Sequence, residues 1–123
     1  MTLFELLEEL KQVDPDIYEE LQNYPIYCSG DEALTVDLLS SRNQTLCEDA
    51  IQGSIQRACE RYGWELEQNY RTRGQNGDLP KNIRHYAVVT SWDNDVHTYR
   101  GMGNSATKAL LAAYVAAVKE EKR

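Results

Sequence analysis

Cysteine, histidine and long hydrophobic runs are all scarce in this sequence. The three cysteines include no C-x-x-C pair, and an odd count argues against a disulfide framework and favours buried free thiols. The two histidines have no thiol at a suitable spacing, so we expect no metal site and no cofactor. The longest apolar run, residues 109–118, has about half the length that a membrane span needs. The N-terminus lacks the basic and apolar regions of a signal peptide, so the sequence predicts a cytoplasmic protein without membrane contact.

Basic side chains are outnumbered in this chain of 123 residues, whose formal net charge is −7. An acidic total argues against a general affinity for nucleic acid. The charge is unevenly divided, because residues 1–60 carry 13 acidic and 3 basic side chains whereas residues 61–123 carry 7 and 10. Halves of opposite sign often have different tasks, so each half is a candidate for a separate surface.

The N-terminal segment predicts two acidic helices that form a hairpin. Thr2 and Glu5 have the spacing of a capping box, and leucines follow at helical intervals. Asp14 can cap a second helix in which Pro15 takes the first position, and Pro25 would end that helix. The exposed side is either a solvated face or a contact surface for a basic partner, such as a protein that otherwise binds nucleic acid. This acidic surface comprises Glu5, Glu8, Glu9, Asp14, Asp16, Glu19 and Glu20.

The second half predicts the order helix, three antiparallel strands, helix. Thr45 and Glu48 form another capping box, and Gly63 can end the helix that they begin. Alternating and β-branched residues predict strands over residues 64–72, 83–92 and 96–102. Residues 26–40 fit either a strand or a short helix, because so short a run has no decisive period.

Together these elements predict an α+β fold. An N-terminal helical hairpin precedes an α-β-β-β-α module that contains a three-stranded antiparallel sheet. We expect residues 1–40 to form an acidic helical region packed on the same core as the module of residues 41–123. Both helices of the module should cover one face of the sheet and leave the other face open.

Residues 45–121 resemble the double-stranded-RNA-binding domain. That family has the same order of elements, and its last helix opens with Gly-x-Gly-x-Ser, matched here by Gly101, Gly103 and Ser105. Ala109 and Ala113 match alanines further along the helix. The chain is also similar to the small proteins called phage ABA sandwich domains, which implies a protein of phage or prophage type.

The corner before the last helix is a candidate anion site. Backbone N–H groups at a helix start favour negative charge, and glycines would let a phosphate come near. Alternatively, the glycines only form the turn and Ser105 only caps the helix. Where the family has phosphate-binding lysines, this sequence has Ala106, Thr107 and Leu110. The candidate basic surface comprises Arg71, Arg73, Lys81, Arg84, Arg100, Gly101, Gly103, Asn104, Ser105 and Lys108.

The last helix is apolar on nearly every side, although packing on a sheet requires only one stripe. Its other sides must meet either the N-terminal hairpin or a second protomer. A surplus face of a few hundred Å², at about 25 cal/mol per Å², would suffice for self-association. We therefore hypothesise a homodimer or higher oligomer. The residues of this candidate self-association surface are Leu110, Leu111, Tyr114, Val115 and Val118.

The sequence offers little support for a catalytic site. Asp93 and Asp95 occupy a turn that favours such residues for backbone reasons. His85 and His97 could be cross-strand neighbours, but a catalytic role would need a third polar partner. The sequence therefore predicts a small non-enzymatic interaction protein that acts through protein–protein contacts and self-association. The alternative is a diverged module that binds double-stranded RNA, other nucleic acid or a nucleotide through the basic surface.

Overall fold

The computed structural model describes residues 2–22, 25–27, 33–35, 44–70, 85–93 and 95–121. Within these ranges it contains helices α1 (Leu3–Val13), α2 (Pro15–Gln22), α3 (Gln44–Tyr62) and α4 (Ala106–Glu121), and strands β1 (Pro25–Tyr27), β2 (Ala33–Thr35), β3 (Glu65–Tyr70), β4 (His85–Ser91) and β5 (His97–Gly103). The predicted α+β fold is confirmed, with an N-terminal helical region, a three-stranded antiparallel sheet and a C-terminal helix.

The N-terminal hairpin forms because both helix starts are capped by side chains. Thr2 accepts a hydrogen bond from the Glu5 N–H at 3.1 Å, and Glu5 Oε1 accepts one from the Thr2 N–H at 3.2 Å, so the predicted capping box is confirmed. Asp14 is the C-cap of α1, where its N–H still donates to the Leu10 carbonyl at 2.8 Å but its φ of −146° leaves the helical range. The same residue begins α2, because its Oδ1 accepts the Ile17 N–H at 3.4 Å.

Two expected boundaries differ from the structure. The helix α2 ends at Gln22, and Pro25 begins β1, which pairs with β2 so that Pro25 lies opposite Thr35. The strand alternative for residues 26–40 therefore holds at residues 26–27 and at Ala33–Thr35, while residues 28–32 and 36–40 lie outside the described part of the chain. The helix α3 begins at Gln44, one residue before the expected cap Thr45, a difference within the usual variation of helix ends.

The main sheet has the order β3-β4-β5 with β4 at its centre, and both pairs are antiparallel as predicted. Gly63 connects α3 to β3 with a left-handed φ of 72°, which favours glycine, and the predicted stop is confirmed. The register places His85 opposite Gly103 and Ser91 opposite His97. The two histidines therefore lie at opposite ends of the hairpin, and the expectation that they could be cross-strand neighbours was wrong.

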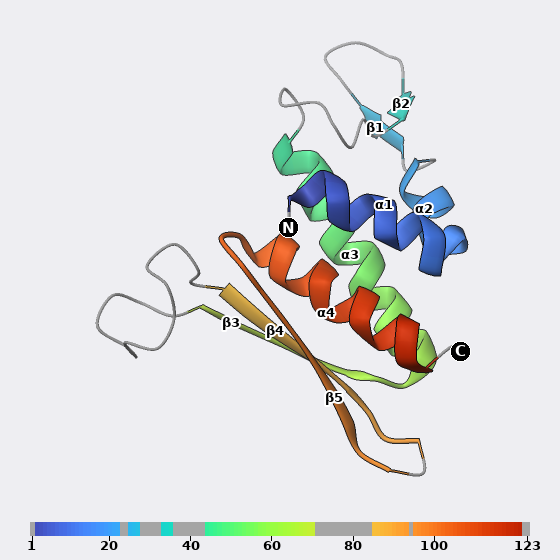
Figure 1. The fold of residues 1–123 in the computed structure, drawn as a ribbon. Coiled ribbons are helices and arrows are strands. Elements are labelled where there is room, and N and C mark those ends of the chain that lie inside the picture. The colour runs from blue at the N-terminus through green and yellow to red at the C-terminus, as the bar shows by residue number, and fades with distance from the viewer. Residues whose placement is uncertain are drawn as a thin grey trace.

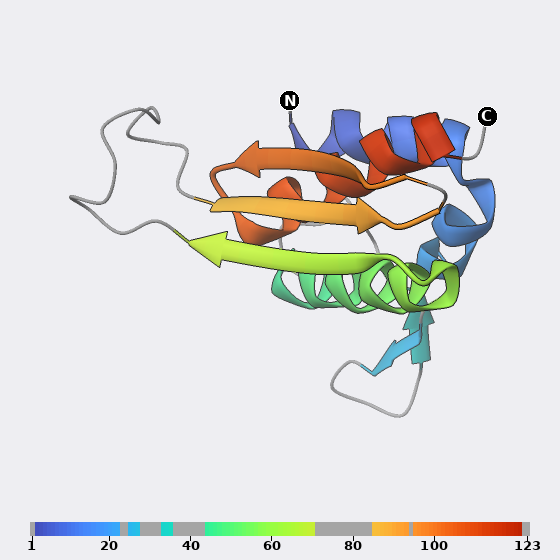
Figure 2. The same cartoon turned by 90° about the horizontal axis from the view of Figure 1, so that it is seen from below.

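The helices cover only one face of this sheet. Figure 1 shows three layers, with the sheet at one side, α3 and α4 in the middle, and α1 and α2 beyond them. Figure 2 looks onto the other face of the sheet and shows the helices behind the strands. Ala87, Val89 and Gly101 are buried on the covered face, while Val88 and Arg100 alternate with them on the open face.

The helix α4 lies at the centre of the core and contacts α1, α3 and the strands. Its apolar surface is thus enclosed by its own chain, and the N-terminal hairpin supplies the cover that the sequence left undecided. The prediction that α4 offers a surface for self-association was wrong, because each residue of that candidate surface is at most 2% exposed within a single chain. These residues are Leu110, Leu111, Tyr114, Val115 and Val118.

One hydrophobic cluster joins both halves of the chain. Leu6, Leu10, Ile17 and Leu21 of the N-terminal helices belong to the same buried cluster as the residues of α3, α4 and the sheet. The expected domain boundary at residue 40 lies outside the described residues. Within the described part of the chain, no helix is long and apolar enough to span a membrane.

Candidate interaction surfaces

The corner between β5 and α4 is built for close packing. Gly101 is buried, and a Cβ atom there would overlap the Ala109 carbonyl oxygen and the Ala113 nitrogen and lie 2.9 Å from the Ala112 Cβ. A Cβ atom on Gly103 would lie 2.9 Å from the Lys108 Cβ. The first glycine therefore lets the α4 backbone rest directly on β5, and the structural interpretation of the corner is supported.

Ser105 caps α4 as predicted. Its Oγ accepts the Lys108 N–H at 3.2 Å, and its carbonyl accepts the Ala109 N–H at 3.1 Å. The cap therefore already satisfies the Lys108 N–H, one of the backbone donors that an anion at this corner would need.

The candidate basic surface is only partly brought together. Gly103, Asn104, Ser105 and Lys108 lie at the corner. The prediction that Gly101 is a binding residue was wrong, because Gly101 lies beneath α4. Arg100 extends from the opposite, open face of the sheet. The remaining members all lie outside the described residues, and they are Arg71, Arg73, Lys81 and Arg84.

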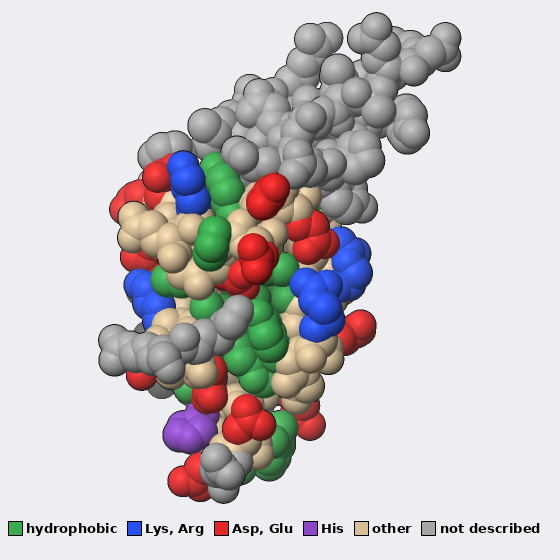
Figure 3. Space-filling model, turned by 90° about the vertical axis from the view of Figure 1, so that its right-hand side faces the viewer, with side chains coloured by type: hydrophobic (Ala, Val, Ile, Leu, Met, Phe, Trp, Pro, Cys, Tyr) green, Lys and Arg blue, Asp and Glu red, His purple; other side chains and the backbone are tan. Residues whose placement is uncertain are grey.

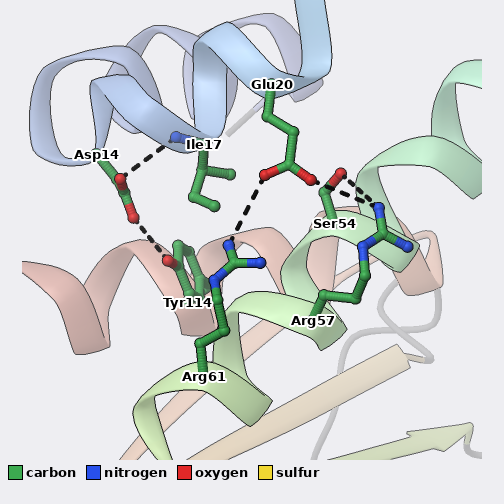
Figure 4. A network of polar contacts seen from close by, with 7 residues as sticks. All are labelled: Asp14, Ile17, Glu20, Ser54, Arg57, Arg61 and Tyr114. Carbon is green, nitrogen blue, oxygen red and sulfur yellow. Dashed lines mark hydrogen bonds and ion pairs between the residues drawn. The ribbon is translucent and has the colours of Figure 1, made fainter. Parts of the chain in front are cut away.

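The acidic surface contains carboxylates that are already engaged within the chain. Glu20 forms ion pairs with Arg57 at 3.6 Å and with Arg61 at 3.7 Å, as Figure 4 shows. Glu9 lies 3.4 Å from Lys119, and backbone and side-chain hydrogen bonds from Thr2 lower the pKa of Glu5. Glu8, Asp16 and Glu19 are exposed. On the side seen in Figure 3, acidic and basic side chains are interspersed and form no single acidic block.

Asp14 must be removed from this surface, because it is only 3% exposed. Its Oδ2 accepts the Tyr114 hydroxyl at 2.6 Å while its Oδ1 caps α2, and both contacts are visible in Figure 4. Burial, followed by the hydrogen bond to Asp14, raises the pKa of Tyr114 far above its ordinary value. Asp14 therefore joins the hairpin to α4 and is a structural residue.

A groove of about 360 Å³ lies between α3 and β3. Trp64 lines it and stacks on Tyr62 at a ring separation of 4.6 Å. Cys59 also lines it, and burial raises the pKa of its thiol to about 11, so this thiol is a poor nucleophile at neutral pH. The full lining is Gln56, Cys59, Glu60, Trp64, Leu66 and Gln68.

Because of the Cys59 thiol, we expect the folded protein to lose stability at alkaline pH. The unfolded chain releases this proton near pH 9, while the folded chain holds it until about pH 11. The free energy of unfolding should therefore fall as the pH rises through this window, by at most about 3 kcal/mol, because the unfolded state binds fewer protons. Urea denaturation between about pH 8 and pH 11 should show that Cys59→Ala reduces this slope. Equal slopes in the two proteins would contradict the assignment.

The open face of the β3-β4-β5 sheet is the main surface that the helices leave uncovered. The register aligns its side chains in three rows, which are Glu65, Thr90 and Thr98, then Glu67, Val88 and Arg100, then Asn69, Tyr86 and Met102. Met102 is 55% exposed at one end of this face. Trp92 and Val96, 56% and 54% exposed, lie just beyond the other end, next to the last residue of β4 and the first residue of β5. The β4–β5 hairpin thus carries exposed apolar side chains near both of its ends and the half-buried Val88 in its middle.

The sequence predicted an open face but did not identify its side chains. The available signal was the alternation in residues 85–91 and 97–103, which separates Tyr86, Val88 and Met102 from Ala87, Val89 and Gly101. Within the described ranges, no group of three or more His, Cys, Asp or Glu side chains is placed to hold a metal ion. Comparison with known proteins found no family model, no curated protein and no solved structure that matches this chain.

Proposed function

We propose that this protein is a non-enzymatic interaction protein whose contact surface is the open face of the β3-β4-β5 sheet. The observation that carries the proposal is the set of exposed apolar side chains on one hairpin, where Trp92, Val96 and Met102 are each more than half exposed. Large apolar side chains that share one rigid surface are typical of protein–protein contacts.

The rigidity of this surface supports the same function. The central strand β4 is anchored from behind by buried Ala87 and Val89, and α4 rests directly on β5 at Gly101. The open face is therefore held in a fixed shape before any partner binds, which lowers the entropy cost of association.

The charge of the open face favours a protein over nucleic acid. Its charged side chains are Glu65, Glu67 and Arg100, so it has more acid than base. A nucleic-acid-binding function would depend on the basic surface, whose loop end lies outside the described residues and whose corner has Lys108 half-buried beside a capped helix start. A phosphate backbone would be attracted to neither region strongly.

Position-specific photo-crosslinking tests this proposal. A photoreactive phenylalanine analogue at position 102 should form protein adducts in the cells that produce the protein. The same analogue at position 19, on exposed α2, should form few. Val88→Lys, which places a charge in the middle of the face, should abolish the adducts at position 102 while circular dichroism shows an unchanged fold.

Two results would overturn the proposal. One is equal crosslinking at positions 19 and 102, with no effect of Val88→Lys. The other is salt-sensitive binding of short duplex RNA that Lys108→Ala weakens and Val88→Lys does not, which would favour the nucleic-acid alternative.

A further inference from the structure

The middle row of the open face carries opposite charges on its two outer strands. Glu67 on β3 and Arg100 on β5 lie on either side of Val88 on β4. Two strand spacings separate them, so they are about 10 Å apart across the sheet. The Asn69 amide donates a hydrogen bond to Glu67 Oε1 at 2.9 Å, which holds that carboxylate over the open face.

This arrangement is complementary to its own copy. When two such faces pack with a two-fold axis parallel to β4, β3 of one copy lies over β5 of the other. Glu67 then faces Arg100 of the second copy, and the pair occurs twice, while the two Val88 side chains meet on the axis. We infer that the occupant of the open face is a second copy of this chain, in this orientation; the inference rests on the proposed function.

The charges also exclude the other simple arrangement. A two-fold axis perpendicular to the strands would place β3 over β3 and bring the two Glu67 carboxylates together, with the two Arg100 guanidinium groups facing each other. Like charges that meet across an interface oppose association. The register thus selects one orientation of the dimer.

The apolar side chains of the central strand fit the selected orientation. Val88 lies on the axis and Tyr86 lies in the next row of β4, so each meets the same residue of the second copy. Met102 on β5 lies over Asn69 of the second copy, beside this apolar row.

The size of the face indicates a weak dimer. The three strands have six or seven residues each and cover about 14 by 23 Å, which is small beside a standard interface of about 800 Å² per partner. The dimer should therefore form at high concentration and dissociate on dilution, so it must be measured over a wide range of concentration.

Sedimentation velocity with charge-reversed variants tests the inference. The unmodified chain should shift from monomer to dimer between about 10 µM and 1 mM. Glu67→Arg and Arg100→Glu should each weaken the dimer by about tenfold or more, because each places like charges opposite one another. Combining the two reversals restores opposite charges and should recover most of the association. Glu19→Arg, which reverses an exposed charge on α2, should leave it unchanged.

The outcomes separate this inference from the proposed function. A chain that stays monomeric at about 1 mM, or a double reversal that associates no better than the single ones, would overturn the second copy as the occupant. Adducts from position 102 that contain another protein would then still support the open face as a contact surface. If those adducts are also absent, the proposed function fails as well.

Discussion

Gly101→Ala will destabilise the protein by about 3 kcal/mol, or will prevent folding, because the new Cβ has no space. It would overlap the Ala109 carbonyl oxygen and the Ala113 nitrogen, which are backbone atoms of α4. Backbone atoms in a helix cannot move aside without shifting the whole helix, and α4 is enclosed by the core on its other sides. Urea denaturation followed by circular dichroism measures the effect.

Gly53→Ala is the matched control, since it makes the same chemical change within α3. A Cβ there would approach only the end of the Arg57 side chain, at 3.3 Å, and that flexible group can move. Alanine should stabilise the helix by about 0.5–1 kcal/mol relative to glycine. Similar effects at positions 53 and 101 would contradict the close packing of α4 on β5.

Asp14→Ala will lower the free energy of unfolding by about 2–4 kcal/mol. The substitution removes the cap of α2 and leaves the buried Tyr114 hydroxyl without its acceptor. Tyr114→Phe should cost about 1–3 kcal/mol, because it removes the hydroxyl that donates to the buried carboxylate. Chemical denaturation of the two single variants and the double variant gives the coupling between them.

Tyr99→Phe provides the control for the loss of a tyrosine hydroxyl. Tyr99 donates to Glu121 at 2.7 Å, but that pair is only partly buried. Its loss should cost no more than about 1 kcal/mol, since water can replace the partner. A coupling energy near zero between Asp14 and Tyr114, or equal costs for the two tyrosines, would contradict the role of Asp14 in joining the hairpin to α4.

Several helix ends were predictable because their signals are local. The Thr2 and Glu5 box, the Asp14 and Ser105 caps and the Gly63 stop each depend on residues within one turn, so sequence spacing was sufficient. The order of strands also followed from local alternation and from the short turn between β4 and β5.

The surfaces were harder to predict, because burial depends on distant partners. Asp14 was expected on the acidic surface, yet its acceptor oxygen meets Tyr114, 100 residues along the chain. The apolar helix α4 required a cover, but composition alone could not choose between α1 and a second protomer. Arg100 and Gly101 are adjacent in the sequence and lie on opposite faces of β5, and the packing of α4 on the Gly101 side decides which of those faces is covered.

A paramagnetic reagent that relaxes solvent-exposed methyl groups tests the central claim most directly. We claim that the chain encloses its own apolar helix and leaves the apolar side chains of the open sheet face available for contact. Methyl NMR of the dilute protein should show strong broadening at Val96 and Met102 and none at Leu111 or Val118. Broadening at Leu111 and Val118, with Met102 protected, would contradict that claim.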